Sequence, residues 1–473
     1  MRIVTIGILI LGLCDALLAQ TVREAVALAN QGKVQEAVEM FETLYQRDEN
    51  NPTVVSWLGY LYLKTGKYAE AVPMLEKATQ LTPKNAEAWN NLGNAYLHTN
   101  QLEKSISAYR KAIEIKPNDA NAHYNLGNLY TKTKQYQRAV EHYQKSLQID
   151  PRDANAHNNL GYAYQMMRLP ARAAEHYKRA TELAPDNATF RFNYALALAE
   201  QGEWQRAAAL LEQALPKMPS EVNGWLKLGE AYTRLRQPEK AIQALQRGIA
   251  ANPDHPDLHY NLGVVHVRRG NLAAAAAAFE NTLRLRPDDA EALNQLGFVQ
   301  LRQRRLDDAE ATLQRALEIN SRLTSAQLNL ATVKRLKGER DTALQLYQQV
   351  IAENPKSQEA RLAVGDLLME KGDLRGAETQ YRAVLKENER SHVAWNNLGL
   401  ALMRLNRVQE AIKALERAVA LNPQSAVYHN NLGAAYERAG QLTKARTMYQ
   451  EALKLDPKLE DAQRNLQRLA NRR

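Results

Sequence analysis

Apolar and small residues recur along this chain with a period of 34 residues, from about residue 22 to its end. If Ala86 is position 1 of a repeat, positions 4, 7, 8 and 11 hold a large residue, leucine, glycine and tyrosine, as in Trp89, Leu92, Gly93 and Tyr96. These positions share a narrow arc at about 100° per residue, which predicts the buried face of a helix. Alanine at position 20, an aromatic residue or leucine at 24 and a small residue at 27 predict a second helix with its own buried seam.

The period predicts twelve full repeats of two helices each, over residues 52–459. They start at residues 52, 86, 120, 154, 188, 222, 256, 290, 324, 358, 392 and 426. An incomplete first repeat is expected at 20–51, and a capping helix with a basic tail at 460–473, because repeat arrays need a polar-backed end.

The helix boundaries also follow from the sequence. Residues whose side-chain oxygen can cap a helix stand just before position 1 in eight repeats: Asn85, Asp119, Asp153, Asn187, Asp289, Ser357, Ser391 and Ser425. The second helix is predicted to begin near position 17, where Pro170 and Pro238 suit the first turn. It should end before the proline that recurs at position 32.

Glycine at position 8 predicts a close approach of the two helices, because it has no Cβ. Ala195 and Ala331 are the exceptions. The repeat at 324–357 also has Lys334 at a core slot and lacks the proline before it, so bending of the array is expected there. Pro73 lies inside a predicted second helix and is expected to kink it.

The first 19 residues read as a secretory signal peptide. Arg2 gives a positive start, residues 3–13 are apolar, and small residues lead to a cleavage site near Ala19. The apolar run is too short to span a membrane, so no stable membrane span is expected. Leu13 precedes the single cysteine, Cys14, where a lipoprotein signal would have a small residue. We therefore expect an exported protein, periplasmic or secreted, without cysteine after cleavage.

Composition narrows the possible partners and chemistry. The net charge is +10, from 62 Lys and Arg against 52 Asp and Glu. Such a balance suits nucleic acid, anionic lipid or acidic polymers and peptides, and export argues against nucleic acid. Histidines recur at position 4, a core slot, and no repeat is expected to supply two metal ligands with a second shell around them, so no metal is predicted; these histidines are His123, His157, His259 and His429.

The chain as a whole resembles the tetratricopeptide repeat family, on the spacing and residue types described above. The resemblance covers about residue 22 to the end. It implies an all-α fold, a right-handed α-solenoid whose first helices line the concave side. No Ser/His/Asp set, phosphate-binding loop or metal-spaced cluster stands outside the repeat pattern, so neither an enzyme nor a cofactor is predicted.

An asparagine column at position 6 is the main candidate binding feature. Position 6 lies nearly opposite the buried arc, so asparagine there is predicted not to help hold the fold. The repeats are similar to those of O-linked N-acetylglucosamine transferases, in which matching asparagines hold an extended peptide by its backbone; the resemblance implies that role here. A carboxamide can donate and accept, which suits a peptide group. The alternative is family consensus without a ligand. The column contains Asn91, Asn125, Asn159, Asn193, Asn261, Asn329, Asn397 and Asn431.

Arginine recurs at position 13 on the same helix stripe. A guanidinium pairs bidentately with carboxylates, so these residues predict binding of an acidic peptide or of an anionic, uronic-acid-type polysaccharide. The alternative is that cations are simply favoured near a helix C-terminus. The candidates are Arg234, Arg268, Arg302, Arg404 and Arg438.

Two functions follow from these observations. The first is an exported, non-catalytic scaffold that binds an extended peptide or partner segment in its concave groove. The second is a periplasmic scaffold subunit of a secretion or polysaccharide-export machine.

Overall fold

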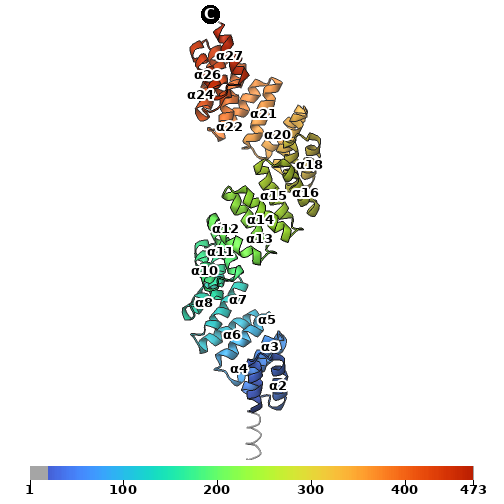
Figure 1. The fold of residues 1–473 in the computed structure, drawn as a ribbon, viewed down its shortest axis with the longest axis vertical. Coiled ribbons are helices and arrows are strands. Elements are labelled where there is room, and N and C mark those ends of the chain that lie inside the picture. Colours follow the sequence, from blue (N-terminus) through green and yellow to red (C-terminus); the bar gives the residue numbers. More distant parts are fainter. Residues whose placement is uncertain (1–19, 472–473) are drawn as a thin grey trace, which may run out of the picture. The chain divides into compact units, whose positions relative to one another are not determined.

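The computed structural model describes residues 20–471, which contain helices and connecting turns and no strand. The chain divides into two compact units, residues 20–252 (unit 1) and 253–471 (unit 2) of the described part. Each unit is a stack of helix-turn-helix repeats, coloured blue to green and green to red in Figure 1. The predicted all-α solenoid is confirmed at this level. The predicted signal peptide lies outside the described residues.

The helices of unit 1 follow the predicted register. They are a helical stretch at residues 20–30, α2 (Val34–Arg47), α3 (Pro52–Lys64), α4 (Tyr68–Leu81), α5 (Ala86–His98), α6 (Leu102–Ile115), α7 (Ala120–Lys132), α8 (Tyr136–Ile149), α9 (Ala154–Met166), α10 (Pro170–Leu183), α11 (Ala188–Glu200), α12 (Trp204–Ala214), the 3-10 turn η1 (Leu215–Lys217), α13 (Val222–Arg234) and α14 (Pro238–Ala251). The stretch at 20–30 and α2 share a core with α3.

Unit 2 continues the same alternation of first and second helices. Its helices are α15 (Pro256–Arg269), α16 (Leu272–Leu285), α17 (Ala290–Arg302), α18 (Leu306–Ile319), α19 (Thr324–Leu336), α20 (Arg340–Glu353), α21 (Gln358–Lys371), α22 (Leu374–Glu387), α23 (His392–Arg404), α24 (Val408–Leu421), α25 (Ala426–Arg438), α26 (Leu442–Leu455) and α27 (Glu460–Ala470). The final helix α27 packs on α26, at the place predicted for the cap.

Local chemistry sets these boundaries as predicted. All eight predicted caps accept a hydrogen bond from a backbone N–H in the first turn of their helix. The second helix ends two residues before the position-32 proline, as α6 does at Ile115 before Pro117. Helix α4 continues through Pro73 from Tyr68 to Leu81.

The glycine at position 8 lies directly against the residue at position 24. A Cβ added to Gly127 would lie 2.7 Å from the ring of Tyr143, which is inside van der Waals contact. Tyr143 is buried, and its hydroxyl donates to Asn128 Oδ1 at 2.7 Å. The predicted close approach of the two helices is therefore confirmed, and it places the tyrosine hydroxyl within reach of first-helix side chains.

Successive repeats touch mainly where the second helix of one packs on the first helix of the next, and consecutive first helices also pack on each other. Helix α3 packs on α5, α5 on α7 and α7 on α9 in unit 1, and α17 on α19, α21 on α23 and α23 on α25 in unit 2. Successive second helices make far less contact. Within each unit the first helices therefore lie on the inner side of the stack. We call the surface formed by their positions 2, 6, 9 and 13 the inner face.

A tyrosine at position 11 joins six of the twelve repeats to the repeat before. Tyr436 donates to Glu416, 20 residues earlier, at 2.6 Å. Burial and this hydrogen bond raise the pKa of Tyr436 to about 12, so the phenol stays protonated as a donor. Lys334 takes the same slot in its repeat. Its ammonium group lies 2.5 Å from Glu310 and 2.8 Å from Glu339, so ion pairs replace the tyrosine hydrogen bond.

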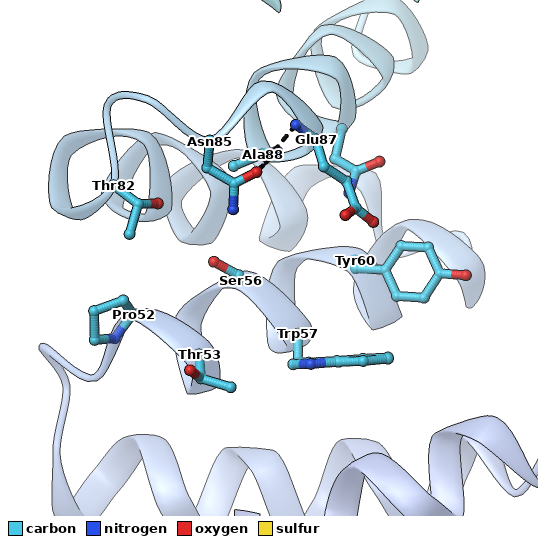
Figure 2. A pocket seen from close by; sticks show the side chains of 10 residues that line it. Pro52, Thr53, Ser56, Trp57, Tyr60, Thr82, Asn85, Glu87 and Ala88 are labelled. Carbon is cyan, nitrogen blue, oxygen red and sulfur yellow. Dashed lines mark hydrogen bonds between the residues drawn. The ribbon is translucent and has the colours of Figure 1, made fainter. Parts of the chain in front are cut away.

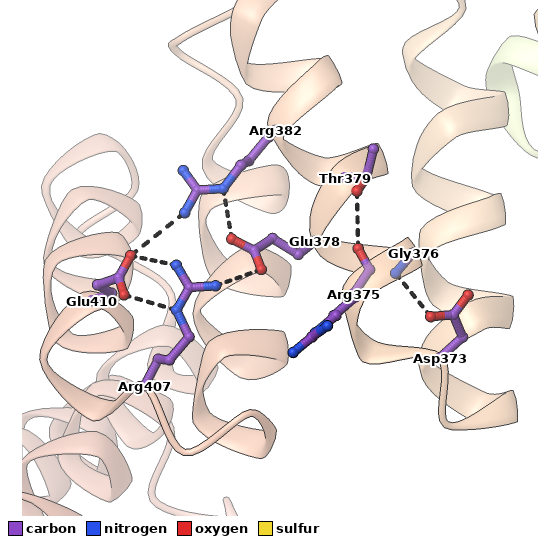
Figure 3. Close-up of polar contacts among 8 residues, drawn as sticks. All are labelled: Asp373, Arg375, Gly376, Glu378, Thr379, Arg382, Arg407 and Glu410. Carbon is purple, nitrogen blue, oxygen red and sulfur yellow. Dashed lines mark hydrogen bonds and ion pairs between the residues drawn. The ribbon is translucent and has the colours of Figure 1, made fainter.

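Second helices are linked by ion pairs on the opposite side of the stack. Arg407, before α24, lies 2.7 Å from Glu378 on α22 and 2.6 Å from Glu410 on α24 (Figure 3). Arg382 on α22 is 2.8 Å from Glu378 and 3.7 Å from Glu410. The alternating charges close a ring across one repeat junction. Glu378 is only 13% exposed, whereas the two arginines and Glu410 are exposed. We expect the exposed pairs with Glu410 to contribute only about 0.2–1 kcal/mol each.

Candidate functional site

The predicted asparagine column lies on the inner face, but its side chains are not free polar groups. Asn261 is exposed, and the other seven predicted asparagines are half-buried. Partial burial makes hydrogen-bond partners necessary, because an unsatisfied buried amide costs about 1–3 kcal/mol.

Most of the column bonds to the preceding repeat. Asn125 Nδ2 donates to Asn90 Oδ1 at 3.1 Å, and the same bond, 35 residues back, recurs three more times among the predicted asparagines. These bonds are Asn193 to Asn158 at 2.8 Å, Asn329 to Asn294 at 2.9 Å and Asn431 to Asn396 at 2.9 Å. The donor is at position 6 and the acceptor at position 5 of the previous first helix. We call this contact the asparagine interlock.

A different acceptor serves where position 5 lacks an amide. For Asn159, the residue at position 5 of the preceding repeat is Tyr124. Asn159 Nδ2 lies 2.9 Å from Asn128 Oδ1 and 3.1 Å from the Tyr124 hydroxyl. Asn397 donates to Asp366 Oδ1 at 3.0 Å. Asn128 and Asp366 both occupy position 9, and each also accepts from a position-24 tyrosine. These contacts through position 9 connect the inner face to the tyrosines packed beneath it.

Two asparagines of the column do not join repeats. Asn261 donates at 2.8 Å to the backbone oxygen of Asp257 in its own helix. The Asn91 side chain has no hydrogen-bond partner within residues 20–471. In the preceding repeat, position 5 holds Ser56 instead of asparagine, and Trp57 comes next in the sequence. These two amides remain available on the inner face.

The expectation that position 6 does not help hold the fold is therefore wrong. That expectation considered each helix by itself, whereas the hydrogen-bond acceptors lie on the first helix of the neighbouring repeat. The acceptor asparagines at position 5 were missed, although the Asn-Asn doublets before Leu-Gly were a visible signal. Asn465 on α27 was missed too; it donates to Asn430 at 3.0 Å and extends the interlock onto the cap.

The interlock leaves part of each amide unused. One N–H of a position-6 amide goes to the neighbouring repeat, and no described donor reaches the Oδ1 atoms of four of them: Asn125, Asn193, Asn329 and Asn431. An amide oxygen has two lone pairs, so it can still accept an N–H from a peptide.

The predicted arginines are exposed at position 13, and most contact their own unit. Arg234 lies 3.6 Å from Glu230 and packs over the Trp204 ring. Arg302 packs over the ring of Phe298, Arg404 donates to the Met369 backbone oxygen, and Arg438 donates to Asn406. No described residue pairs with Arg268. Arg268 is thus the member best placed to meet an anion.

Two histidine pairs lie within consecutive repeats of unit 1. His123 Nδ1 is 3.1 Å from His142 Nδ1, and His157 Nδ1 is 3.2 Å from His176 Nδ1. Each pair joins the position-4 histidine of a first helix to the position-23 histidine of the second helix, a contact that was not expected from the sequence. His123 Nε2 faces the Pro117 carbonyl oxygen at 3.1 Å, so it must carry the hydrogen, and Nδ1 of the neutral ring accepts from His142.

Burial and the neighbouring His123 lower the pKa of His142 to about 4, and burial lowers the pKa of His123 as well. Both rings are therefore neutral at pH 7. Residues 20–471 contain no group of three or more His, Cys, Asp or Glu side chains arranged to hold a metal ion. Nor does any helix in this range combine the length and apolarity needed to cross a membrane.

Family models match the chain in several overlapping segments. A TPR repeat model matches residues 59–100, 93–134 and 127–167; tetratricopeptide repeat models match 28–72 and, in a second series, 328–392, 362–426 and 396–460. The model of the cilia and flagella-associated protein 70 C-terminal domain matches 148–334. Together these matches run without a gap from residue 28 to residue 460.

Solved structures show similar but distant chains. The APC/C hetero-tetramer Cut9–Hcn1 has a chain 17% identical, covering 94% of this chain and 95% of its own, with a TM-score of 0.45. YrrB, described as a TPR protein with an unusual peptide-binding site, is 26% identical over 38% of this chain and 93% of its own, with a TM-score of 0.36. MamA is 26% identical over 36% of this chain and 94% of its own, with a TM-score of 0.33. No curated protein matches by sequence.

Proposed function

This chain is a tetratricopeptide repeat protein, and we propose that it is a non-catalytic scaffold that binds an extended peptide segment of a partner protein on its inner face. The observation that carries the proposal is the set of inner-face amide groups without a partner in a neighbouring repeat: the Asn91 and Asn261 side chains, and the four amide oxygens that the interlock leaves unused. Because a carboxamide reads peptide groups rather than side chains, this face suits many partner sequences.

The expected affinity is modest. Each unit carries two of these oxygens, which would supply about 2 kcal/mol if each accepts one peptide N–H at about 1 kcal/mol net. Association and ordering of the peptide consume several kcal/mol. We therefore expect micromolar or weaker binding unless side-chain contacts contribute. The interlock offsets part of this cost, since it fixes each amide before the peptide arrives.

Acidic character in the partner is a second element of the proposal. The net charge of +10 and the exposed Arg268 favour carboxylates near α15. Arg234, Arg302, Arg404 and Arg438 would have to exchange an internal contact for a ligand, so we assign them a smaller contribution.

The test uses the two inner-face asparagines outside the interlock. Asn91→Ala and Asn261→Ala, singly and combined, should weaken capture of a library of extended peptides displayed on phage, without loss of helicity. Asn281→Ala is the matched control, because Asn281 on the second helix α16 makes the same bond to the backbone oxygen four residues back, at 3.1 Å. Equal peptide capture by the double variant and the control would reject the proposal.

A second candidate is a periplasmic scaffold subunit of a secretion or polysaccharide-export machine. The predicted signal peptide near the N-terminus favours it. Cell fractionation with N-terminal sequencing of the isolated protein tests the location, and a chain beginning near residue 20 in the envelope fraction is expected. Salt-sensitive binding of purified protein to polyuronic acid, reduced by Arg268→Ala, would favour a polysaccharide ligand over a peptide.

A further inference from the structure

The first junction of the inner face in unit 1, between α3 and α5, lacks the interlock. Trp57 occupies position 6 of the first full repeat, where asparagine stands in most later repeats, and Ser56 occupies position 5. No interlock can therefore form between α3 and α5. In its place is a cleft of about 380 Å³, lined by Pro52, Thr53, Ser56, Trp57, Tyr60, Thr82, Asn85, Glu87, Ala88 and Asn91.

The aromatic wall of the cleft is fixed by packing. The Trp57 ring stacks on Phe41 with centroids 6.1 Å apart and an interplanar angle of 6°. Its other neighbour is Tyr60, whose ring meets it edge-on at 5.7 Å and 82°. Figure 2 shows both rings on α3 facing Glu87 at the start of α5 across the cleft. The indole is thus held in one orientation before any ligand binds.

Several polar side chains of the cleft have no partner within residues 20–471. Glu87 carries the only formal charge among the ten lining residues, and it forms no ion pair within residues 20–471. The indole N–H of Trp57, the hydroxyls of Thr53 and Ser56 and the Asn91 amide also lack a hydrogen-bond partner in this part of the chain. Asn85, by contrast, is used as the cap of α5.

An aromatic wall opposite a lone carboxylate is complementary to a cation. A cation over an indole face gains about 0.5–2 kcal/mol, and a planar guanidinium stacks on a ring while donating to a carboxylate. The Tyr60 ring already attracts one cation, since Lys64 Nζ lies 5.6 Å from its centroid. Lys64 itself does not line the cleft.

We propose that this cleft binds an arginine side chain of the partner segment, with the guanidinium on Trp57 and its N–H groups donated to Glu87. The inference rests on the proposed function, because the arginine belongs to a peptide lying along the inner face. It adds a register: the peptide would be anchored at α3 and α5 by this side chain, while the amides of later repeats hold its backbone.

The test is a titration of the full-length protein labelled with 5-fluorotryptophan, followed by fluorine NMR. The chain has five tryptophans, and Trp57→Phe assigns the Trp57 signal. The probes are the N-acetyl amides of arginine, lysine and glutamate. We expect the arginine probe to shift the Trp57 signal saturably, the lysine probe to bind more weakly, and the glutamate probe to leave the signal unchanged.

Two variants separate the carboxylate from general surface charge. Glu87→Gln should raise the apparent Kd of the arginine probe about threefold to fivefold, which is the size of an exposed ion pair. Glu103→Gln, an exposed carboxylate on the second helix α6, should leave that Kd unchanged. An unshifted Trp57 signal, an unchanged Kd in Glu87→Gln, or binding of the lysine or glutamate probe as tight as that of arginine would overturn the proposal.

The failures of the two proposals are distinguishable. If the arginine probe shifts the Trp57 signal but Asn91→Ala and Asn261→Ala leave peptide capture unchanged, the arginine site in the cleft is supported and the peptide-binding face is rejected. If peptides are captured through those asparagines but show no arginine enrichment relative to peptides selected on Trp57→Leu, the peptide-binding face stands and the cleft assignment is rejected.

Discussion

Asn431 and Asn396 are 35 residues apart and share one hydrogen bond, from Asn431 Nδ2 to Asn396 Oδ1 at 2.9 Å. Asn396 is buried, with 6% of its surface exposed, so its oxygen depends on this donor. The bond joins α23 to α25 directly across a repeat junction. The amides of the inner face are therefore structural first, and any ligand must use what the structure leaves over.

Removing this donor should loosen the junction. Asn431→Ala leaves the Asn396 oxygen without its donor, which costs about 1 kcal/mol. Backbone amide hydrogen exchange in α23 and α25 should therefore become about fivefold faster. Asn261→Ala is the matched control, because its amide bonds only within its own helix, and its exchange should change little. Equal protection in the two variants would contradict the interlock.

Filling the position-8 gap should destabilise the repeat strongly. Gly127→Ala places a Cβ 2.7 Å from the Tyr143 ring, and overpacking of this kind costs about 1–3 kcal/mol. Urea unfolding followed by circular dichroism measures the loss. The double variant Gly127→Ala/Tyr143→Leu reproduces the natural combination of Ala195 and Leu211, both fully buried, and should recover part of the stability. No recovery would mean that the ring is not the obstacle.

The His123–His142 pair should make unit 1 sensitive to acid. Because the folded pKa of His142, about 4, lies below its unfolded value of about 6.5, the unfolded state binds more protons between these values. The pair's contribution is complete above about pH 6.5 and decreases as pH falls toward 4. After a discount for partial exposure, we expect a loss of about 1–2 kcal/mol.

Unfolding by urea at pH 7 and pH 5 tests this expectation. His142→Gln should show a smaller difference in the free energy of unfolding between the two pH values than the unchanged protein does. His429→Gln is the control, because its imidazole faces only the Pro423 carbonyl and has no histidine partner. The same pH difference in His142→Gln as in the unchanged protein would argue against the pair.

Lys334 should be replaceable by tyrosine but not by alanine. Lys334→Ala leaves Glu339 without this partner and Glu310 with Lys337 alone, at an expected cost of about 1–2 kcal/mol. In Lys334→Tyr the new hydroxyl belongs to a residue 20 positions after Gln314. Gln144 and Tyr164 have the same spacing, and Gln144 donates to the Tyr164 hydroxyl at 3.0 Å. Thermal unfolding should show most of the loss restored. A larger loss for tyrosine than for alanine would contradict this.

The sequence by itself determined the helices, their boundaries and the face that each buries. These features depend on contacts three or four residues apart and on single residues such as Asp119, which caps α7, and Pro117, which follows α6. The close approach at Gly127 was also predictable, because a missing Cβ has the same consequence in every repeat.

Only the tertiary structure decided what the inner-face side chains do. Asn125 bonds to Asn90, whereas Asn159 bonds to Asn128, because Tyr124 stands where an amide would be at position 5. Which residues come within reach at all depends on how two first helices lie against each other. His123 meets His142 because of how the two helices of one repeat pack together. A repeat period records that helices stack, but it does not record the offset at which they stack. That offset limits which polar atoms can meet. At Trp57 the junction holds a cleft in which several polar side chains have no described partner.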